Sequence, residues 1–324
     1  VIQKTEMETV LLVVKIQMMM IPQNFEKKVP RFMSEFGFQS FPELSTITQF
    51  ADSSQWSLDS EVMKSHQKHP RGNNLILEYM QREYPVPNDF DKFVYASQIL
   101  QAEGMRIGLE AHRRSQPYCM GTLYWQFNDC WPVASWSSRD YDGNWKALHY
   151  TAQDVFAPIA LSLSKDEEGF IDLWAMSELD SAFTDTFVVR LYDMKGNELW
   201  PTHQEEAEIK QGAQLLKGKM DHYSQGQFII CELKNKGVKS KTLFTSLVKE
   251  MNIEQPNIQT TWKRDTLTLS TDIPAFQVYL HGIHGRFSDN FFTLLPNKEK
   301  SVVCTGTDKK GLKIYTLADL KDKE

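Results

Sequence analysis

A single carboxylate inside an apolar, aromatic stretch constrains the fold of this chain more than any other sequence feature. The run from Arg31 to Pro42 reads RFMSEFGFQSFP, and Glu35 is its only acidic residue. The pattern predicts a buried strand that ends at the glycine and proline, so Glu35 would lie near the strand's C-terminal end. An ionised side chain is costly there unless it is paired or used. Two interpretations stay open, a catalytic carboxylate of a barrel enzyme and a helix cap or ion-pair partner.

A second informative segment is rich in tryptophan. Residues 121–150 hold four of the eight tryptophans of the chain. We expect a short buried strand from Gly121 to Trp125, followed by polar groups from Gln126 to Asp129. Indole faces with interspersed amides and a carboxylate suit the apolar faces and hydroxyl groups of a sugar ring. The alternative is a tryptophan-rich core with ordinary turn residues.

Together these two segments resemble the glycoside hydrolase family 2 β-mannosidases. The run SEFGFQSFP at 34–42 is similar to the nucleophile segment of that family, with Glu35 in the nucleophile's place. The run YWQFNDCW at 124–131 is similar to the last barrel strand and its loop. There Trp125 stands in the place of the tryptophan that forms a wall of the −1 sugar site. The resemblance is specific from about Asn24 to Tyr150 and weaker beyond.

The resemblance implies a fold and a division into domains. We expect an α/β plus all-β chain, in which the C-terminal part of a (β/α)8 TIM barrel is followed by two immunoglobulin-like β-sandwich domains. The expected boundaries are 1–157 for the barrel part, 158–250 for the first sandwich and 251–324 for the second. Because a complete barrel needs about 250 residues, only its last portion would be present here.

The resemblance also implies an activity, that of a retaining exo-β-mannosidase. Such an enzyme removes terminal non-reducing β-D-mannose from a β-mannoside or manno-oligosaccharide, without cofactor or metal. Glu35 would attack the anomeric carbon, Trp125 would pack on the sugar, and Asn128 and Asp129 would bind hydroxyl groups or fix the loop. A second carboxyl group about 5–5.5 Å from the nucleophile must act as acid/base.

The expected acid/base, a glutamate that follows asparagine at the end of a barrel strand, is missing from the sequence. The single Asn-Glu pair, Asn197-Glu198, lies in a predicted hairpin turn. The chain would therefore carry the nucleophile alone, and we expect little or no turnover from it in isolation.

The first 22 residues lack the aromatic and glycine residues expected before a nucleophile segment of this family. This favours a mispredicted start or a shifted reading frame; the alternative is a strand from Thr9 to Ile16.

A different class of function also fits the sequence. The barrel part could be inert while the β domains act as a carbohydrate-binding or packing module, with Trp174, Trp200 and Trp262 as the candidate platforms. Activity on another β-linked sugar, as in other family 2 glycosidases, is a further alternative. The sequence indicates neither a compartment nor an oligomeric state.

Composition narrows the possible partners. The net charge of −6 provides no basic surface for nucleic acid or anionic lipid, and the apolar run of the first residues is too short to span a membrane. The four cysteines are scattered, without zinc-ligand spacing, and Cys119 and Cys130 are expected to be small core residues. His281 and His284 would face opposite sides of a strand, whereas His66 and His69 are expected to be solvated.

The periodicity of apolar residues changes near residue 157. Before it, we expect a helical region at 58–82 interrupted near Pro70, a long helix from a cap at Asn88 or Asp89 to Arg114, and a shorter helix at 144–157. After it, a period of two predicts strands. They are expected at 171–176, 186–192, 227–233, 259–262, 266–270, 275–279 and 312–316.

Overall fold

The structure of the protein is a computed structural model that describes residues 29–306 and 309–321. The expectations for residues 1–22 therefore lie outside the described residues. The chain divides into two compact units, and each is described by itself. Unit 1 comprises residues up to Arg82 together with Ser97–Phe156, and unit 2 comprises Glu83–Ala96 together with Ala157 onwards.

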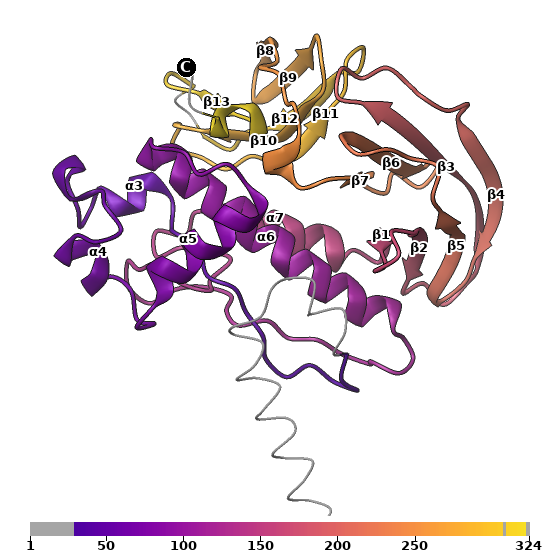
Figure 1. Cartoon of the computed structure of the whole chain (residues 1–324), viewed down its shortest axis with the longest axis horizontal. Coiled ribbons are helices and arrows are strands. Elements are labelled where there is room, and N and C mark those ends of the chain that lie inside the picture. Colours follow the sequence, from indigo (N-terminus) through magenta and orange to yellow (C-terminus); the bar gives the residue numbers. More distant parts are fainter. Residues whose placement is uncertain (1–28, 307–308, 322–324) are drawn as a thin grey trace, which may run out of the picture. The chain divides into compact units, whose positions relative to one another are not determined.

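Helices provide most of the regular structure before residue 157 (Figure 1). The predicted long helix is confirmed as α6 (Phe90–Arg114), and Asp89 caps it by accepting a hydrogen bond from the Lys92 N–H at 3.1 Å. The predicted break at Pro70 separates two helices. The other helices are α3 (Leu44–Ile47), η1 (Ser53–Gln55), α4 (Glu61–Ser65), α5 (Gly72–Glu83) and α7 (Ala147–Val155).

The two segments expected to be buried strands are extended but form only isolated bridges. Met33 and Thr122 pair in parallel, and residues 121–125 are half-buried or exposed, so the predicted burial of the second segment is wrong. Strands of a parallel sheet are buried when they have neighbours at both edges and helices on the outside. Among the residues that the structure describes, these two segments have only each other as parallel partners.

The first part of unit 2 contains two antiparallel sheets that share one hydrophobic core. Side chains such as Leu173, Val189 and Ile229 alternate into that core, which confirms the predicted strands at 171–176, 186–192 and 227–233. One sheet has the order β1 (Ile159–Lys165), β2 (Ile171–Ser177), β5 (Gly212–Met220). The other has the order β4 (His203–Ile209), β3 (Phe183–Asp193), β6 (Gln227–Leu233), β7 (Lys241–Phe244).

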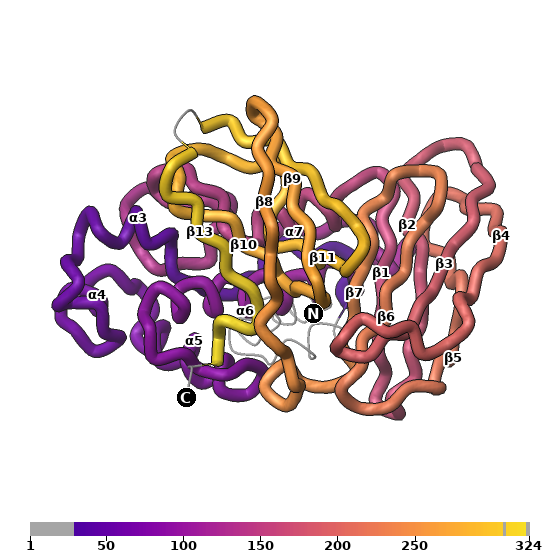
Figure 2. Tube along the Cα trace, turned by 90° about the horizontal axis from the view of Figure 1, so that it is seen from above, coloured from indigo at the N-terminus to yellow at the C-terminus, as the bar shows by residue number. Residues whose placement is uncertain are grey.

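The second part of unit 2 repeats this arrangement with shorter strands. Figure 2 shows the paired strands β8 and β9 side by side. One sheet has the order β12 (Lys300–Val303), β9 (Thr266–Thr271), β8 (Ile258–Lys263), and the other the order β11 (Phe292–Leu294), β10 (Ala275–His281), β13 (Lys313–Tyr315). The short helix η2 (Val248–Glu250) precedes these strands and η3 (Leu317–Leu320) follows them.

The first two turns of α6 belong to unit 2 as well. Tyr95 is buried, its ring stacks on Tyr279 at 5.5 Å, and its hydroxyl donates to the carbonyl oxygen of Gln277 at 2.6 Å. The hydroxyl of Tyr315 donates to Asp91 at 2.9 Å. A stack of aromatic rings with satisfied hydroxyl groups thus joins this helical segment to strand β10 within the unit.

Two minor expectations are corrected by the structure. Cys119 is buried as predicted, but Cys130 is exposed. His66 is not a solvated histidine, because its ring stacks on Phe50 at 3.8 Å and its Nδ1 donates to the carbonyl oxygen of Pro132 at 2.6 Å. Within 29–306 and 309–321, none of the helices has the length and apolar character needed to cross a bilayer.

Candidate active site

The segments that carry Glu35 and Trp125 lie side by side in parallel. The Met33 N–H donates to the Gly121 carbonyl at 2.9 Å, and the Leu123 N–H donates to the Met33 carbonyl at 2.8 Å. The Trp125 N–H then donates to the carbonyl oxygen of Phe36 at 2.8 Å. This ladder places the residue after Glu35 directly beside Trp125, so the two residues singled out from the sequence lie at the same end of paired segments.

Gly37 is required at this point because the two segments approach closely. A Cβ atom on Gly37 would lie 2.2 Å from the carbonyl oxygen of Trp125 and 2.9 Å from Cδ1 of Trp136. Both distances are shorter than any real contact of a Cβ atom. The glycine of the FGF run therefore allows the backbone after Glu35 to pack against Trp125 and the indole of Trp136.

The Glu35 carboxylate has no competing partner in the part of the chain that the structure describes. Its side chain is half-buried, between the buried residues Met33 and Phe36, and it makes no hydrogen bond or ion pair with any described residue. Among residues 29–306 and 309–321, neither alternative interpretation from the sequence, a helix cap or an ion-pair partner, has a counterpart. Carboxylates of this kind serve as nucleophiles in glycosidases.

Trp125 presents much of its side chain to solvent. It is 45% exposed, and the peptide bond that joins it to Gln126 is cis. Leu123 and Phe127, two residues before and after it, are 57% and 54% exposed. An exposed indole on a paired segment can provide an apolar platform for one face of a sugar ring.

Asp129 fixes the loop that follows Trp125. Its side chain is buried and accepts hydrogen bonds from the hydroxyl groups of Ser135 at 2.9 Å and Ser137 at 2.6 Å, and from Nε2 of Gln126 at 2.9 Å. Burial raises the pKa of the Asp129 carboxyl group, and its hydrogen bonds from Ser137 and Ser135 oppose that shift. Asn128 is exposed, with its Nδ2 donating to the carbonyl of Asp129 at 3.3 Å. In this geometry Asp129 orders the loop, and Asn128 is the more accessible of the two.

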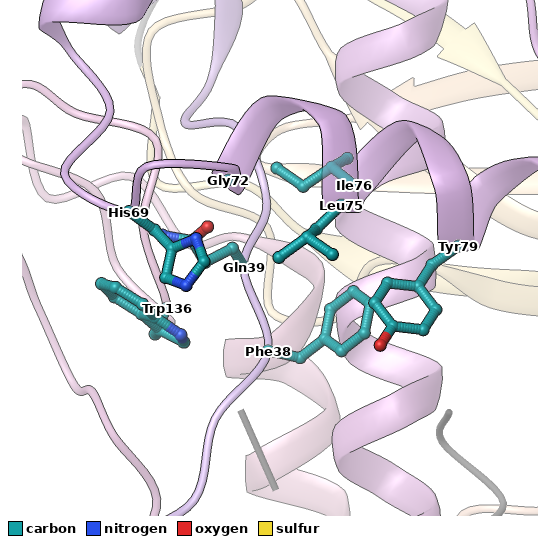
Figure 3. Close-up of a pocket in the computed structure, with 8 residues that line it drawn as sticks. All are labelled: Phe38, Gln39, His69, Gly72, Leu75, Ile76, Tyr79 and Trp136. Atoms are coloured by element: carbon teal, nitrogen blue, oxygen red, sulfur yellow. The ribbon is translucent and has the colours of Figure 1, made fainter. Parts of the chain in front are cut away.

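Phe38 and Gln39, three and four residues after Glu35, line a small pocket (Figure 3). In Figure 3, Trp136 and His69 lie on one side, and Phe38 and Tyr79 lie on the other, with Gln39 between them. Phe38 and Tyr79 pack with ring centroids 5.2 Å apart, and Trp136 and His69 make an edge contact at 6.5 Å. The remaining lining residues are Gly72, Leu75 and Ile76. The narrow space between these rings adjoins Trp136, which itself contacts Gly37.

Helix α6 contributes residues that the sequence reasoning missed. Ser97, Gln98 and Gln101 are completely or almost completely buried, and all three hydrogen-bond to the segment that follows Glu35. The signal that could have revealed them is the occurrence of three polar residues on the apolar face of a long helix.

Lys146, which precedes α7, is also fully buried. Its Nζ lies near the carbonyl oxygens of Ser40 and Ser135, and burial lowers its pKa to about 8.

Other chemically distinctive groups belong to other segments of the chain. The Asn197-Glu198 pair forms the turn between β3 and β4 in unit 2, as predicted, with the Asp193 N–H donating to the Asn197 carbonyl at 3.0 Å. In the described residues, no group of three or more His, Cys, Asp or Glu side chains is arranged to hold a metal ion.

Comparison with known proteins identifies relatives of this chain. The chain is 28% identical to the β-mannosidase of Capra hircus over 306 residues, which cover 84% of this chain and 35% of that protein. It is 34% identical to the β-mannosidase of Rattus norvegicus over 175 residues, which cover 50% of this chain and 20% of that protein. Residues 253–320 match the family model Ig_mannosidase, an Ig-fold domain.

The chain is a homologue of the C-terminal portion of β-mannosidases. It spans about a third of the length of the curated β-mannosidases that it matches over most of its own length. The β-mannosidase of Dictyoglomus thermophilum has a similar fold, with a TM-score of 0.84 and 22% identity, over 92% of this chain and 38% of that chain. The exo-chitosanase CsxA of Amycolatopsis orientalis has a TM-score of 0.71 at 16% identity, over 89% of this chain and 42% of that chain.

Proposed function

We propose that this β-mannosidase homologue is the nucleophile-bearing part of a retaining exo-β-mannosidase. The single observation that carries the proposal is the parallel ladder that brings Glu35 and Trp125 to one end of neighbouring segments, with the Trp125 N–H bonded to the Phe36 carbonyl at 2.8 Å. A carboxylate that attacks the anomeric carbon must lie within reach of the sugar ring, and an apolar platform beside it can hold that ring in place.

The two segments with α6 between them form one parallel repeat of a barrel. Parallel neighbours need a crossover connection, and α6 (Phe90–Arg114) lies between them in the sequence. We infer that residues up to 157 are the last portion of a (β/α)8 barrel, and that 158–250 and 251–324 are two immunoglobulin-like domains. The exposed side chains of Leu123 and Phe127 would then face the part of the barrel that this chain does not contain.

In the proposed reaction, Glu35 is the nucleophile and Trp125 is the platform for the sugar. The Glu35 carboxylate attacks the anomeric carbon of a terminal β-mannoside, the bond to the departing oxygen breaks, and an ester to Glu35 forms with inverted configuration. Attack by water then breaks that ester and restores the β configuration. A second carboxyl group must protonate the departing oxygen and later deprotonate the water, and we assign it to a part of the enzyme outside this chain. Trp125 supports the sugar, and Asp129 holds the loop that follows Trp125.

A substrate that needs no acid catalyst tests this assignment on the chain as it stands. In 2-deoxy-2-fluoro-β-D-mannosyl fluoride the departing fluoride needs no proton, and the fluorine at C2 slows hydrolysis of the ester. We expect mass spectrometry to find one fluoromannosyl group on the peptide that contains Glu35, and none in the Glu35→Gln variant. Unactivated manno-oligosaccharides should be turned over slowly or not at all.

Absence of the adduct from a folded wild-type chain, or its attachment to another residue, would contradict the proposal. Robust hydrolysis of manno-oligosaccharides by the isolated chain would contradict the assignment of the acid/base to another part of the enzyme.

The alternative of a carbohydrate-binding module receives no specific support, because Trp174, Trp200 and Trp262 are all half-buried. Trp200 packs against the core of the first sandwich, and Trp262 packs against the core of the second.

A further inference from the structure

The side chain of Gln101 connects both halves of the candidate active site. Gln101 lies on α6 and is fully buried, with 0% of its surface exposed. Its Oε1 accepts a hydrogen bond from the Ser40 hydroxyl at 2.7 Å. Its Nε2 donates to the carbonyl oxygen of Phe38 at 2.7 Å and to that of Ser137 at 3.3 Å. One amide therefore satisfies three groups on two separate segments.

The three groups that Gln101 bonds are close in the sequence or in space to Glu35 and Trp125, the residues proposed for catalysis. Phe38 and Ser40 are three and five residues after Glu35 in the sequence. Ser137 follows Trp136, whose indole contacts Gly37, and the Ser137 hydroxyl donates to the Asp129 carboxylate at 2.6 Å. That carboxylate in turn accepts from Gln126, the residue after Trp125. If the Gln101 amide moved, the backbone at Phe38 and at Ser137 would lose hydrogen bonds. Glu35 would then shift with the first segment, and Trp125 would shift through Asp129 and Gln126.

Other contacts support the same junction without replacing Gln101. Ser40 and Ser135 exchange two backbone hydrogen bonds, at 2.9 and 3.1 Å. The Nζ atom of Lys146 is 3.5 Å from the Ser40 carbonyl and 3.4 Å from that of Ser135, so those bonds are long. Among the described residues, Gln101 is the only side chain that donates a hydrogen bond to the carbonyl oxygens of Phe38 and Ser137. Without it, both buried carbonyl groups would lack a partner, and the backbone on either side could move to find one.

We propose that Gln101 is a positioning residue for the glycosyl-transfer step, which holds the Glu35 and Trp125 segments in register; this rests on the proposed function. It touches neither the sugar nor the reacting atoms, and it acts through the backbone at Phe38 and Ser137. The amide is suited to this role because it donates and accepts at once without carrying a charge. A carboxylate in its place would bring its lone pairs against two carbonyl oxygens.

The test compares Gln101→Met with Gln153→Met. Methionine keeps the length of the side chain but removes all three hydrogen bonds, whereas Gln153 is exposed on α7. Circular dichroism first establishes that both variants are folded. The rate constant for labelling by saturating 2-deoxy-2-fluoro-β-D-mannosyl fluoride is expected to fall about 10- to 100-fold in Gln101→Met and to be unchanged in Gln153→Met, since small displacements of a reacting group have large kinetic effects.

A second readout does not depend on the chemistry. The indole ¹⁵N–¹H resonances of Trp125 and Trp136, assigned by single Trp→Phe variants, should shift in Gln101→Met and stay in place in Gln153→Met. If Gln101→Met does not fold, Ser40→Ala removes one of the three bonds and should slow labelling about 3- to 10-fold. Labelling within twofold of wild type, with unmoved indole resonances, in the folded variant would overturn the proposal.

The two readouts separate the possible failures. If the wild-type chain is not labelled at all, the proposed nucleophile is wrong, and the indole resonances alone decide whether Gln101 positions the two segments. Resonances that move in Gln101→Met or Ser40→Ala, and not in Gln153→Met, would support that positioning. Resonances that stay in place would overturn it.

Discussion

At the scale of single residues, Asp129 is a buried carboxylate whose hydrogen bonds hold the loop after Trp125. It accepts hydrogen bonds from two hydroxyl groups and one amide while it is itself buried. Because removing a buried acceptor leaves its donors unsatisfied, we expect Asp129→Ala to lower the free energy of unfolding by about 1–3 kcal/mol. Urea denaturation followed by circular dichroism measures this change. Asp59→Ala, at an exposed position, should leave stability unchanged, and equal effects of the two variants would contradict the assignment.

We expect His112 to make the free energy of unfolding depend on pH. It is buried, its Nδ1 is 2.8 Å from the Thr122 hydroxyl, and burial lowers its pKa to about 4, with a smaller contribution from the charge of Arg114. In the unfolded chain its pKa is near 6.5, so between pH 6.5 and 4 only the unfolded state binds the proton. Stability contributed by neutral His112 is therefore complete above pH 6.5 and is lost as the pH falls to 4, by at most about 3 kcal/mol.

Urea denaturation of the chain between pH 7 and 4 tests this pH dependence. His112→Gln should have a flatter profile than the wild-type chain, because glutamine does not titrate. His222→Gln is the matched control, since the side chain of His222 is 89% exposed. A wild-type profile that is as flat as that of His112→Gln would show that the burial of His112 does not control acid stability.

At the scale of elements, the contact between the two paired segments depends on a missing side chain. A Cβ atom on Gly37 would lie 2.2 Å from the Trp125 carbonyl, so Gly37→Ala must separate the segments. We expect the variant to lose about 3 kcal/mol of stability through overpacking, and to be labelled much more slowly by the fluoromannosyl fluoride. Gly226→Ala is a useful comparison, because its Cβ would meet no atom within 4 Å.

The comparison separates crowding from backbone strain. Gly226 has a φ of +73°, so alanine there should cost about 1 kcal/mol from conformation alone and should leave labelling unchanged. Gly37 has no such backbone requirement, and its cost would come from the atoms of Trp125 and Trp136. If Gly37→Ala were as stable and as reactive as wild type, the close approach of the two segments would not exist in solution.

At the scale of the whole molecule, the chain exposes apolar side chains along the segment that carries Trp125. Met120 and Leu123 are 65% and 57% exposed, and Phe127 is 54% exposed. Apolar side chains that are exposed together are typical of surfaces that associate with another protein surface. We expect the wild-type chain to bind the dye ANS and to self-associate at micromolar concentrations, and the double variant Met120→Lys, Leu123→Lys to do both less.

Val303→Lys provides the control for this prediction. Val303 is 48% exposed on β12, outside the Trp125 segment, so its replacement should leave dye binding and sedimentation as in the wild-type chain. An equal reduction by Val303→Lys would point to a general effect of charge rather than to this surface. No change in the double variant would mean that these side chains contribute nothing to association.

Much of the fold could be predicted from local sequence patterns. The long helix ends at Arg114, as expected, because its apolar spacing persists to that point and its first turn is capped by Asp89. The strands of unit 2 were predictable because alternation over four or more residues determines which face is buried. The burial of residues 121–125 was not, because it depends on neighbouring strands rather than on the segment itself.

For the candidate site, the sequence by itself determined the residue types that chemistry needs. Glu35, Trp125, Asn128 and Asp129 were recognisable because they occur in uncommon local runs, and their roles in glycosyl transfer remain predictions. Only the tertiary structure showed that Asp129 is turned into a hydrogen-bond network, that His66 stacks on an aromatic ring, and that Gln101 joins two distant segments. The physical reason is that hydrogen bonds and packing between residues far apart in the sequence depend on positions in space, which no local pattern contains.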